Sequence, residues 1–122
     1  MAGEPIPGAE TLLEAYDLIT GDRQAAYDHP SEDYAKVVEI FAALTGIRLS
    51  LEQALLFMVS IKFARLRTNL SRDVLHHDSL VDSMGYLGCL AMVRAKKDTE
   101  KAALEEGYTA WMTDRSARAT DS

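Results

Sequence analysis

Apolar residues at intervals of three and four are the feature that most constrains the fold of this chain. This spacing places side chains on one face of an α-helix, and it recurs along several stretches, whereas no stretch alternates apolar and polar residues. The sequence therefore predicts an all-α protein, folded as a bundle of four to five helices. With 122 residues, 48% of them hydrophobic, the chain can bury a core of its own.

Glycine and proline mark the predicted ends of the first two helices. Residues 1–8 contain two prolines and two glycines and are expected to form a flexible leader. The first helix then spans about 9–20 and stops at Gly21. Pro30 suits the first turn of a second helix, which ends at Gly46.

A capping box marks the start of the third helix. Ser50 and Gln53 stand three residues apart, so each side chain can satisfy a backbone donor of the other. This helix runs to about Asn69. The fourth helix begins near Asp78, and an Ala-, Lys- and Glu-rich segment continues as helix over about 94–112.

Residues 9–112 are therefore expected to form a single helical domain, followed by a disordered tail over 113–122. Gly85 and Gly88 lie inside the predicted fourth helix, where each costs about 1 kcal/mol relative to Ala. Their presence indicates close helix contact or a bent axis at this point.

Charge and cysteine content exclude several classes of protein. Residues 1–46 carry nine acidic against two basic side chains, 47–93 carry four against five, and 94–122 carry six of each. The chain lacks the basic face that duplex nucleic acid requires, so nucleic acid is not an expected partner. Cys89 alone cannot form a disulfide framework. The sequence also contains no run of about 20 apolar residues, the length that is needed to span a membrane. We expect a cytoplasmic protein.

Asp78 and Asp82 form the candidate metal site. They stand four residues apart, which places both carboxylates on one helix face, about 6 Å apart along the axis. Two such ligands can hold Mg²⁺ while water and substrate phosphates complete its coordination. The alternative is that the acids only favour the helix dipole. Tyr86 lies on the same side of this helix as Asp82 and is a candidate substrate-binding residue. We expect Asp82 to face the interior of the bundle, where a carboxylate must be paired, metal-bound or neutralised.

Lys62 and Arg65 form the complementary cationic pair on the third helix. An antiparallel hairpin of the third and fourth helices would bring them near Asp78 and Asp82. Such cations can bind substrate phosphates beside a carboxylate-held metal. The alternative is a structural salt bridge.

The polar connection between the first two helices is a further candidate. Arg23 and His29 lie in it, and we expect both to reach the bundle and bind substrate. The alternative is a loop that is tied down locally and caps its neighbouring helices. The histidines lack the spacing of the usual zinc sites.

Four segments of the chain resemble a small family of phage and prophage proteins over residues 10–93. Its members typically carry Gly-Asp-Arg, Tyr-Gly-His-Pro, Lys-x-x-Arg-Leu and Asp-x-x-x-Asp-x-x-Gly-Tyr, in that order. The corresponding segments here are GDRQAAYDHP, SEDYAKVVEIFAALTG, LEQALLFMVSIKFARL and DSLVDSMGYLGCL. That family is in turn similar to the MazG-like all-α nucleotide pyrophosphohydrolases, in which an acidic pair that opens a helix binds Mg²⁺.

The resemblance implies a MazG-like bundle that hydrolyses a nucleoside triphosphate to a monophosphate and pyrophosphate. Asp78 and Asp82 would then be catalytic and hold Mg²⁺, the cationic pair would neutralise phosphate charge, and a metal-activated water would attack phosphorus. Two departures bear on this. The second acidic pair of MazG-like proteins, Glu-x-x-Glu, is missing before Asp78, and Asp28 replaces the usual glycine before His29.

The leading expectation is therefore a phage-type protein of the host cytoplasm that binds a nucleoside phosphate, with catalysis left open. The alternative is a non-enzymatic interaction protein that binds and inhibits a host protein, and a third is a structural oligomer without a ligand. Leu104, Tyr108 and Trp111 form an apolar stripe on a segment that needs a packing partner. We therefore expect a homo-oligomer or docking of this segment on its own bundle.

Overall fold

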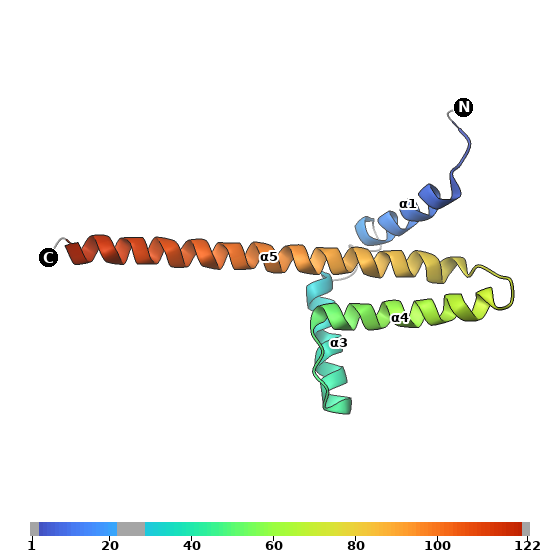
Figure 1. The fold of residues 1–122 in the computed structure, drawn as a ribbon, viewed down its shortest axis with the longest axis horizontal. Coiled ribbons are helices and arrows are strands. Elements are labelled where there is room, and N and C mark those ends of the chain that lie inside the picture. Colours follow the sequence, from blue (N-terminus) through green and yellow to red (C-terminus); the bar gives the residue numbers. More distant parts are fainter. Residues whose placement is uncertain (1–2, 22–28, 121–122) are drawn as a thin grey trace.

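The computed structural model describes residues 3–21 and 29–120, and every regular element in them is an α-helix. The helices, labelled as in Figure 1, are α1 (Pro7–Thr20), α3 (Pro30–Thr45), α4 (Leu51–Leu70) and α5 (His77–Thr120). These residues contain no strand, which confirms the all-α prediction.

The predicted ends of α3 and α4 are confirmed by their caps. α3 begins at Pro30 and ends at Gly46, whose φ of 76° lies in the left-handed region that favours glycine. In the capping box of α4, Ser50 Oγ accepts from the Gln53 backbone N–H at 3.1 Å, and Ser50 N donates to Gln53 Oε1 at 2.9 Å. α1 starts earlier than predicted, at Pro7, because proline suits a first helical turn.

α5 is longer than the sequence predicts. The sequence indicates a helix to about 112 and a disordered tail over 113–122, whereas α5 continues without a break for 44 residues to Thr120. An existing helix gains a hydrogen bond for each added residue without a second nucleation. Ion pairs four residues apart also support it, at 3.3 Å for Arg94–Asp98 and 3.1 Å for Arg118–Asp114.

α5 is the axis on which the other helices pack (Figure 1). α4 lies antiparallel to its first half, α1 packs on another side of that half, and α3 crosses α5 steeply and extends away from it. A small core forms at the crossing from Leu55 of α4 and from Cys89 and Val93 of α5, with the half-buried Ile19 and Tyr34 against it. The second half of α5 extends beyond these contacts.

The two glycines of α5 allow α1 to approach closely. A Cβ atom at Gly88 would lie 2.8 Å from Ile19 Cδ1, and one at Gly85 would lie 3.9 Å from Ile19 Cγ2. A hydrogen atom is all that fits at Gly88 without a shift of Ile19. The expected close helix contact is therefore present.

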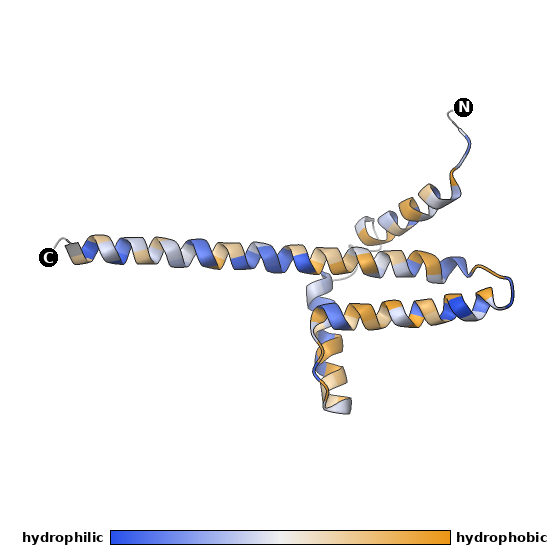
Figure 2. Ribbon diagram, in the orientation of Figure 1, coloured by the Kyte–Doolittle hydropathy of each residue, from blue (hydrophilic) through white to orange (hydrophobic). Residues whose placement is uncertain are grey.

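Large apolar side chains remain exposed on all four helices, and Figure 2 shows that each of these helices carries apolar residues. They include Leu12, Leu13 and Tyr16 on α1, Ile40 and Leu44 on α3, Leu56, Phe57 and Phe63 on α4, and Leu104, Tyr108 and Trp111 on α5. Where such side chains gather into one contiguous patch, they mark an interaction surface. The helices form a bundle whose outer faces are left open.

Candidate functional site

The contact between α4 and α5 brings together part of the predicted site. We call this region the seam, and its polar residues are Lys62 and Arg65 of α4 and Asp78 and Asp82 of α5. Lys62 Nζ lies 3.0 Å from Asp82 Oδ2, because the antiparallel helices place the second half of α4 beside the start of α5. The side chain of Lys62 is 15% exposed and that of Asp82 is 36% exposed. Asp82 is thus half-buried, and it has the cationic partner that such a position requires.

Asp78 and Arg65 are exposed residues near this pair. Asp78 lies one helical turn before Asp82, and Arg65 lies about one turn after Lys62. Across 3–21 and 29–120, no three His, Cys, Asp or Glu side chains gather in a way that could hold a metal ion. The seam therefore contains two carboxylates one helical turn apart, and the second of them, Asp82, is paired with Lys62. The predicted site residue Arg23 lies outside the described residues.

Tyr86 lies one turn beyond Asp82 on α5. Both residues line a pocket of about 120 Å³, together with Leu18 and Ile19 of α1. The Tyr86 ring packs edge-on against Tyr34, with ring centroids 6.2 Å apart. Burial raises the pKa of the Tyr34 hydroxyl, and the neighbouring Tyr86 raises it further. The pocket is smaller than the roughly 300 Å³ of a typical ligand cavity, so a ligand at the seam would lie mostly on its surface.

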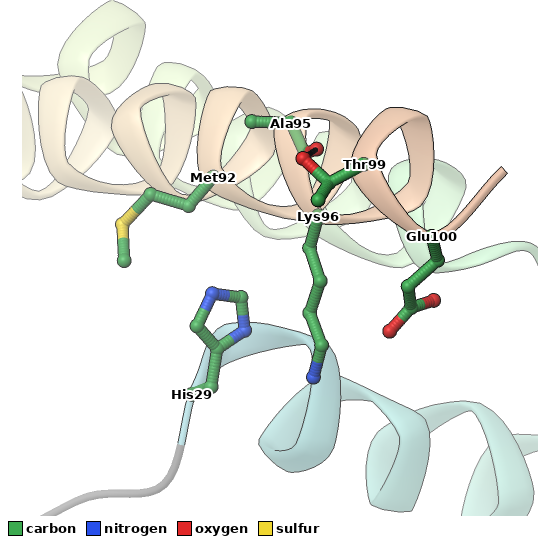
Figure 3. Close-up of a pocket in the computed structure, with 6 residues that line it drawn as sticks. All are labelled: His29, Met92, Ala95, Lys96, Thr99 and Glu100. Carbon is green, nitrogen blue, oxygen red and sulfur yellow. Dashed lines mark hydrogen bonds between the residues drawn. The ribbon is translucent and has the colours of Figure 1, made fainter. Parts of the chain in front are cut away.

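His29 lies at a different place, next to the middle of α5 (Figure 3). It caps α3, because His29 Nδ1 accepts from the Ser31 backbone N–H at 3.1 Å. It also lines an open pocket of about 450 Å³ with Met92 and Lys96. Met92 is ten residues from Asp82 on one helix, about 15 Å along its axis. His29 therefore caps its own helix and reaches α5, but not beside the seam.

Three long-range polar contacts add residues that the sequence does not indicate. They are Lys96 Nζ with Ser31 Oγ at 3.1 Å, Lys97 Nζ with Glu52 Oε1 at 2.6 Å, and His77 Nε2 with Glu14 Oε2 at 2.6 Å. The hydrogen bond from Lys97 lowers the pKa of Glu52. The partners lie 45 to 65 positions apart, so no local spacing signals them.

The fold and the seam define an all-helical protein with a polar pair between two antiparallel helices. None of the described helices has the length and apolar content to cross a membrane. Over residues 10–94 the chain matches the family described as "Domain of unknown function (DUF6378)", and it belongs to that family.

Two phage proteins are similar to this chain. It is 30% identical over 86 residues to the "Gene 55 protein" of Mycobacterium phage D29, across 70% of this chain and 54% of that protein. It is 27% identical over 88 residues to the "Gene 55 protein" of Mycobacterium phage L5, across 71% and 54%. The chain thus spans about half the length of these relatives. No solved structure matches it. The resemblance to a phage family is confirmed, whereas the comparisons do not extend it to MazG-like proteins.

Proposed function

We propose that the protein binds a nucleoside phosphate at the α4–α5 seam, with Mg²⁺ between the phosphates and the Asp82 carboxylate, in the cytoplasm of the phage's host. The observation that carries this proposal is the 3.0 Å contact of Lys62 with Asp82. It supports the proposal because it sets a cation, of the kind that binds phosphate, beside a carboxylate, of the kind that binds Mg²⁺. Because Asp82 is 36% exposed, solvent and ligand can reach it.

Each polar side chain of the seam has a role in this proposal. Lys62 and the exposed Arg65 neutralise phosphate charge. Asp78 and Asp82 supply oxygen ligands to Mg²⁺, whose other positions go to water and phosphate. Tyr86, one turn beyond Asp82, contacts the nucleoside. His29 is left out of this site because of its distance along α5.

The proposed function is binding of the nucleoside phosphate. The Asp-x-x-x-Asp pair resembles the acidic pair of MazG-like enzymes, but those enzymes use a second acidic pair as well. In the part of the chain that the structure describes, no three metal-ligating side chains gather at one place. Two carboxylates suit a metal that a phosphate ligand brings with it. Release of pyrophosphate from a bound triphosphate would extend the proposal to catalysis.

A thermal-shift screen of nucleoside mono-, di- and triphosphates, with and without Mg²⁺, tests the proposal. A ligand at 100 times its Kd stabilises the folded state by about 2.7 kcal/mol, so at least one nucleotide should raise the Tm by several degrees when Mg²⁺ is present. Lys62→Met should abolish the shift, whereas Lys101→Met, an exposed lysine on α5, should keep it. If no nucleotide raises the Tm of the wild type, the proposal fails.

A non-enzymatic protein that binds and inhibits a host protein is the second candidate. The exposed apolar side chains favour it, and the acidic α1, with Leu12, Leu13 and Tyr16 exposed, fits a basic partner. A tagged chain should then retain one host protein, and Leu13→Glu with Tyr16→Glu should release it. A nucleotide-dependent Tm shift without such capture would exclude this candidate.

A further inference from the structure

α3 and the turn after it present an apolar surface that the described part of the chain leaves uncovered. We call this surface the arm face, and its five residues are Val37, Ile40, Leu44, Ile47 and Phe57. They are between 40% and 80% exposed. Phe57 of α4 joins the face to α3 through Phe41, with ring centroids 6.2 Å apart. Figure 2 shows the apolar half of α3 extending away from α5.

α3 has few contacts of its own to hold it in this position. Of its 16 residues, Pro30 and Val38 are buried. Isolated helices of about this length are marginal in water, and their stability comes from packing an apolar face. An occupant on the arm face would supply that packing.

The area of the arm face matches half of a symmetric interface. A large aromatic residue has roughly 200 Å² of area and an aliphatic one somewhat less, so the exposed fractions amount to about 550 Å² per chain. Two copies that cover each other's arm face completely would bury about 1,100 Å², which is above the roughly 1,000 Å² that a biological interface should clear.

The charges around the arm face suit an identical partner. Asp33 pairs with Lys36 at 3.4 Å and Glu39 pairs with Arg48 at 3.0 Å, which leaves Glu32 in the first turn as the acid in excess. A second copy therefore meets little like charge. α1 differs, since it carries three acidic residues and no Lys or Arg, and within the described part of the chain only Glu14 among the three contacts a basic side chain, that of His77. Two copies of α1 would therefore bring like charges together.

We propose that the arm face is the interface of a symmetric dimer, and that its occupant is the arm face of a second copy of this chain. Each α3 packs against the α3 of the other copy, and Phe57 closes the edge of the contact. The dimer interface is separate from the Lys62–Asp82 seam. The dimer can therefore be tested independently of nucleotide binding, and failure of one proposal does not affect the other.

Sedimentation velocity of the full chain over a range of concentrations tests the dimer. The wild type should sediment at twice its 13.5 kDa. Leu44→Glu should raise the dimer dissociation constant by roughly 30-fold or more, as expected of a central interface residue. Leu104→Glu is the matched control, because Leu104 is 75% exposed and Leu44 is 80% exposed. It should leave the dissociation constant unchanged. A monomeric wild type, or a dimer that Leu104→Glu disrupts and Leu44→Glu does not, would overturn the proposal.

Cross-linking tests the same interface without relying on a disruptive variant. Cys89 is buried, which raises the pKa of its thiol and leaves it unreactive, so the wild type serves as the blank. With a short bis-maleimide, Ile40→Cys should give covalent dimers and Leu104→Cys should not. Dimers from position 104 alone, or none from position 40, would contradict the arm-face dimer.

Discussion

Lys62 and Asp82 lie close together because two separate features of the sequence agree. The capping box fixes where α4 begins, and the short connection to α5 makes the two helices antiparallel, so a cation late in α4 must lie near an acid early in α5. This pair was therefore predictable. The contact of Lys96 with Ser31 was not, because it depends on the crossing of α3 over α5, which no local pattern specifies.

The stability of an Asp82→Asn variant measures how much of this pairing is structural. Loss of one partner of a fully buried pair costs about 3–5 kcal/mol, and because Asp82 is 36% exposed we expect a smaller loss of about 1–2 kcal/mol. Asp98→Asn, at an exposed pair on α5, should cost less than about 0.5 kcal/mol. Urea unfolding of both variants provides the values. Equal losses would show that the seam pair adds nothing beyond a surface contact.

The contact of Lys97 with Glu52 predicts a specific acid sensitivity. The pKa of Glu52 lies below its usual value of 4.5 in the folded state, chiefly because Lys97 donates a hydrogen bond to it. The stabilisation is complete above that usual value and is lost as the pH falls through the folded-state pKa. Glu52→Gln should therefore lose less stability than the wild type between roughly pH 6 and pH 3. Unfolding midpoints at both pH values test this, with Glu105→Gln as the control. Parallel losses in wild type and Glu52→Gln would refute it.

Among the elements, local signals account for α3 and α4 but not for α5. Proline, glycine and a capping box determine the ends of α3 and α4 through contacts within a few residues. The sequence predicts helix only to about residue 112 and a disordered end over 113–122, because polar residues replace apolar ones there. A helix that is already nucleated by packing at its start continues through such a segment at little cost in free energy. A short window of sequence cannot predict this, because the nucleation takes place outside the window.

The packing of α1 on α5 predicts different effects at its two glycines. Alanine is favoured over glycine in a helix by about 1 kcal/mol. At Gly85 the added Cβ would make an ordinary contact with Ile19 at 3.9 Å, so Gly85→Ala should stabilise by about 0.5–1 kcal/mol. At Gly88 the Cβ would lie 2.8 Å from Ile19, so the strain should cancel the gain in Gly88→Ala. Chemical unfolding compares the two. A larger gain at Gly88 would mean that α1 does not pack there.

The whole molecule divides where α5 leaves the other helices. The family match ends at residue 94, close to the point at which α3 and the start of α4 contact α5 through Lys96 and Lys97. The part of α5 beyond it carries the exposed Leu104, Tyr108 and Trp111. The family match thus contains the seam and the arm face, while the part of α5 beyond residue 94 lies outside it.

Calorimetric titration of Mg²⁺ and a nucleoside triphosphate into the full chain tests the central claim most directly. We expect saturable binding that requires Mg²⁺, is lost in Asp82→Asn and is kept in Asp98→Asn, with all three proteins folded by circular dichroism. Binding that survives in Asp82→Asn would move the site away from the seam. No binding to the wild type with any nucleotide would contradict the account and leave Lys62 and Asp82 as a structural bridge between α4 and α5.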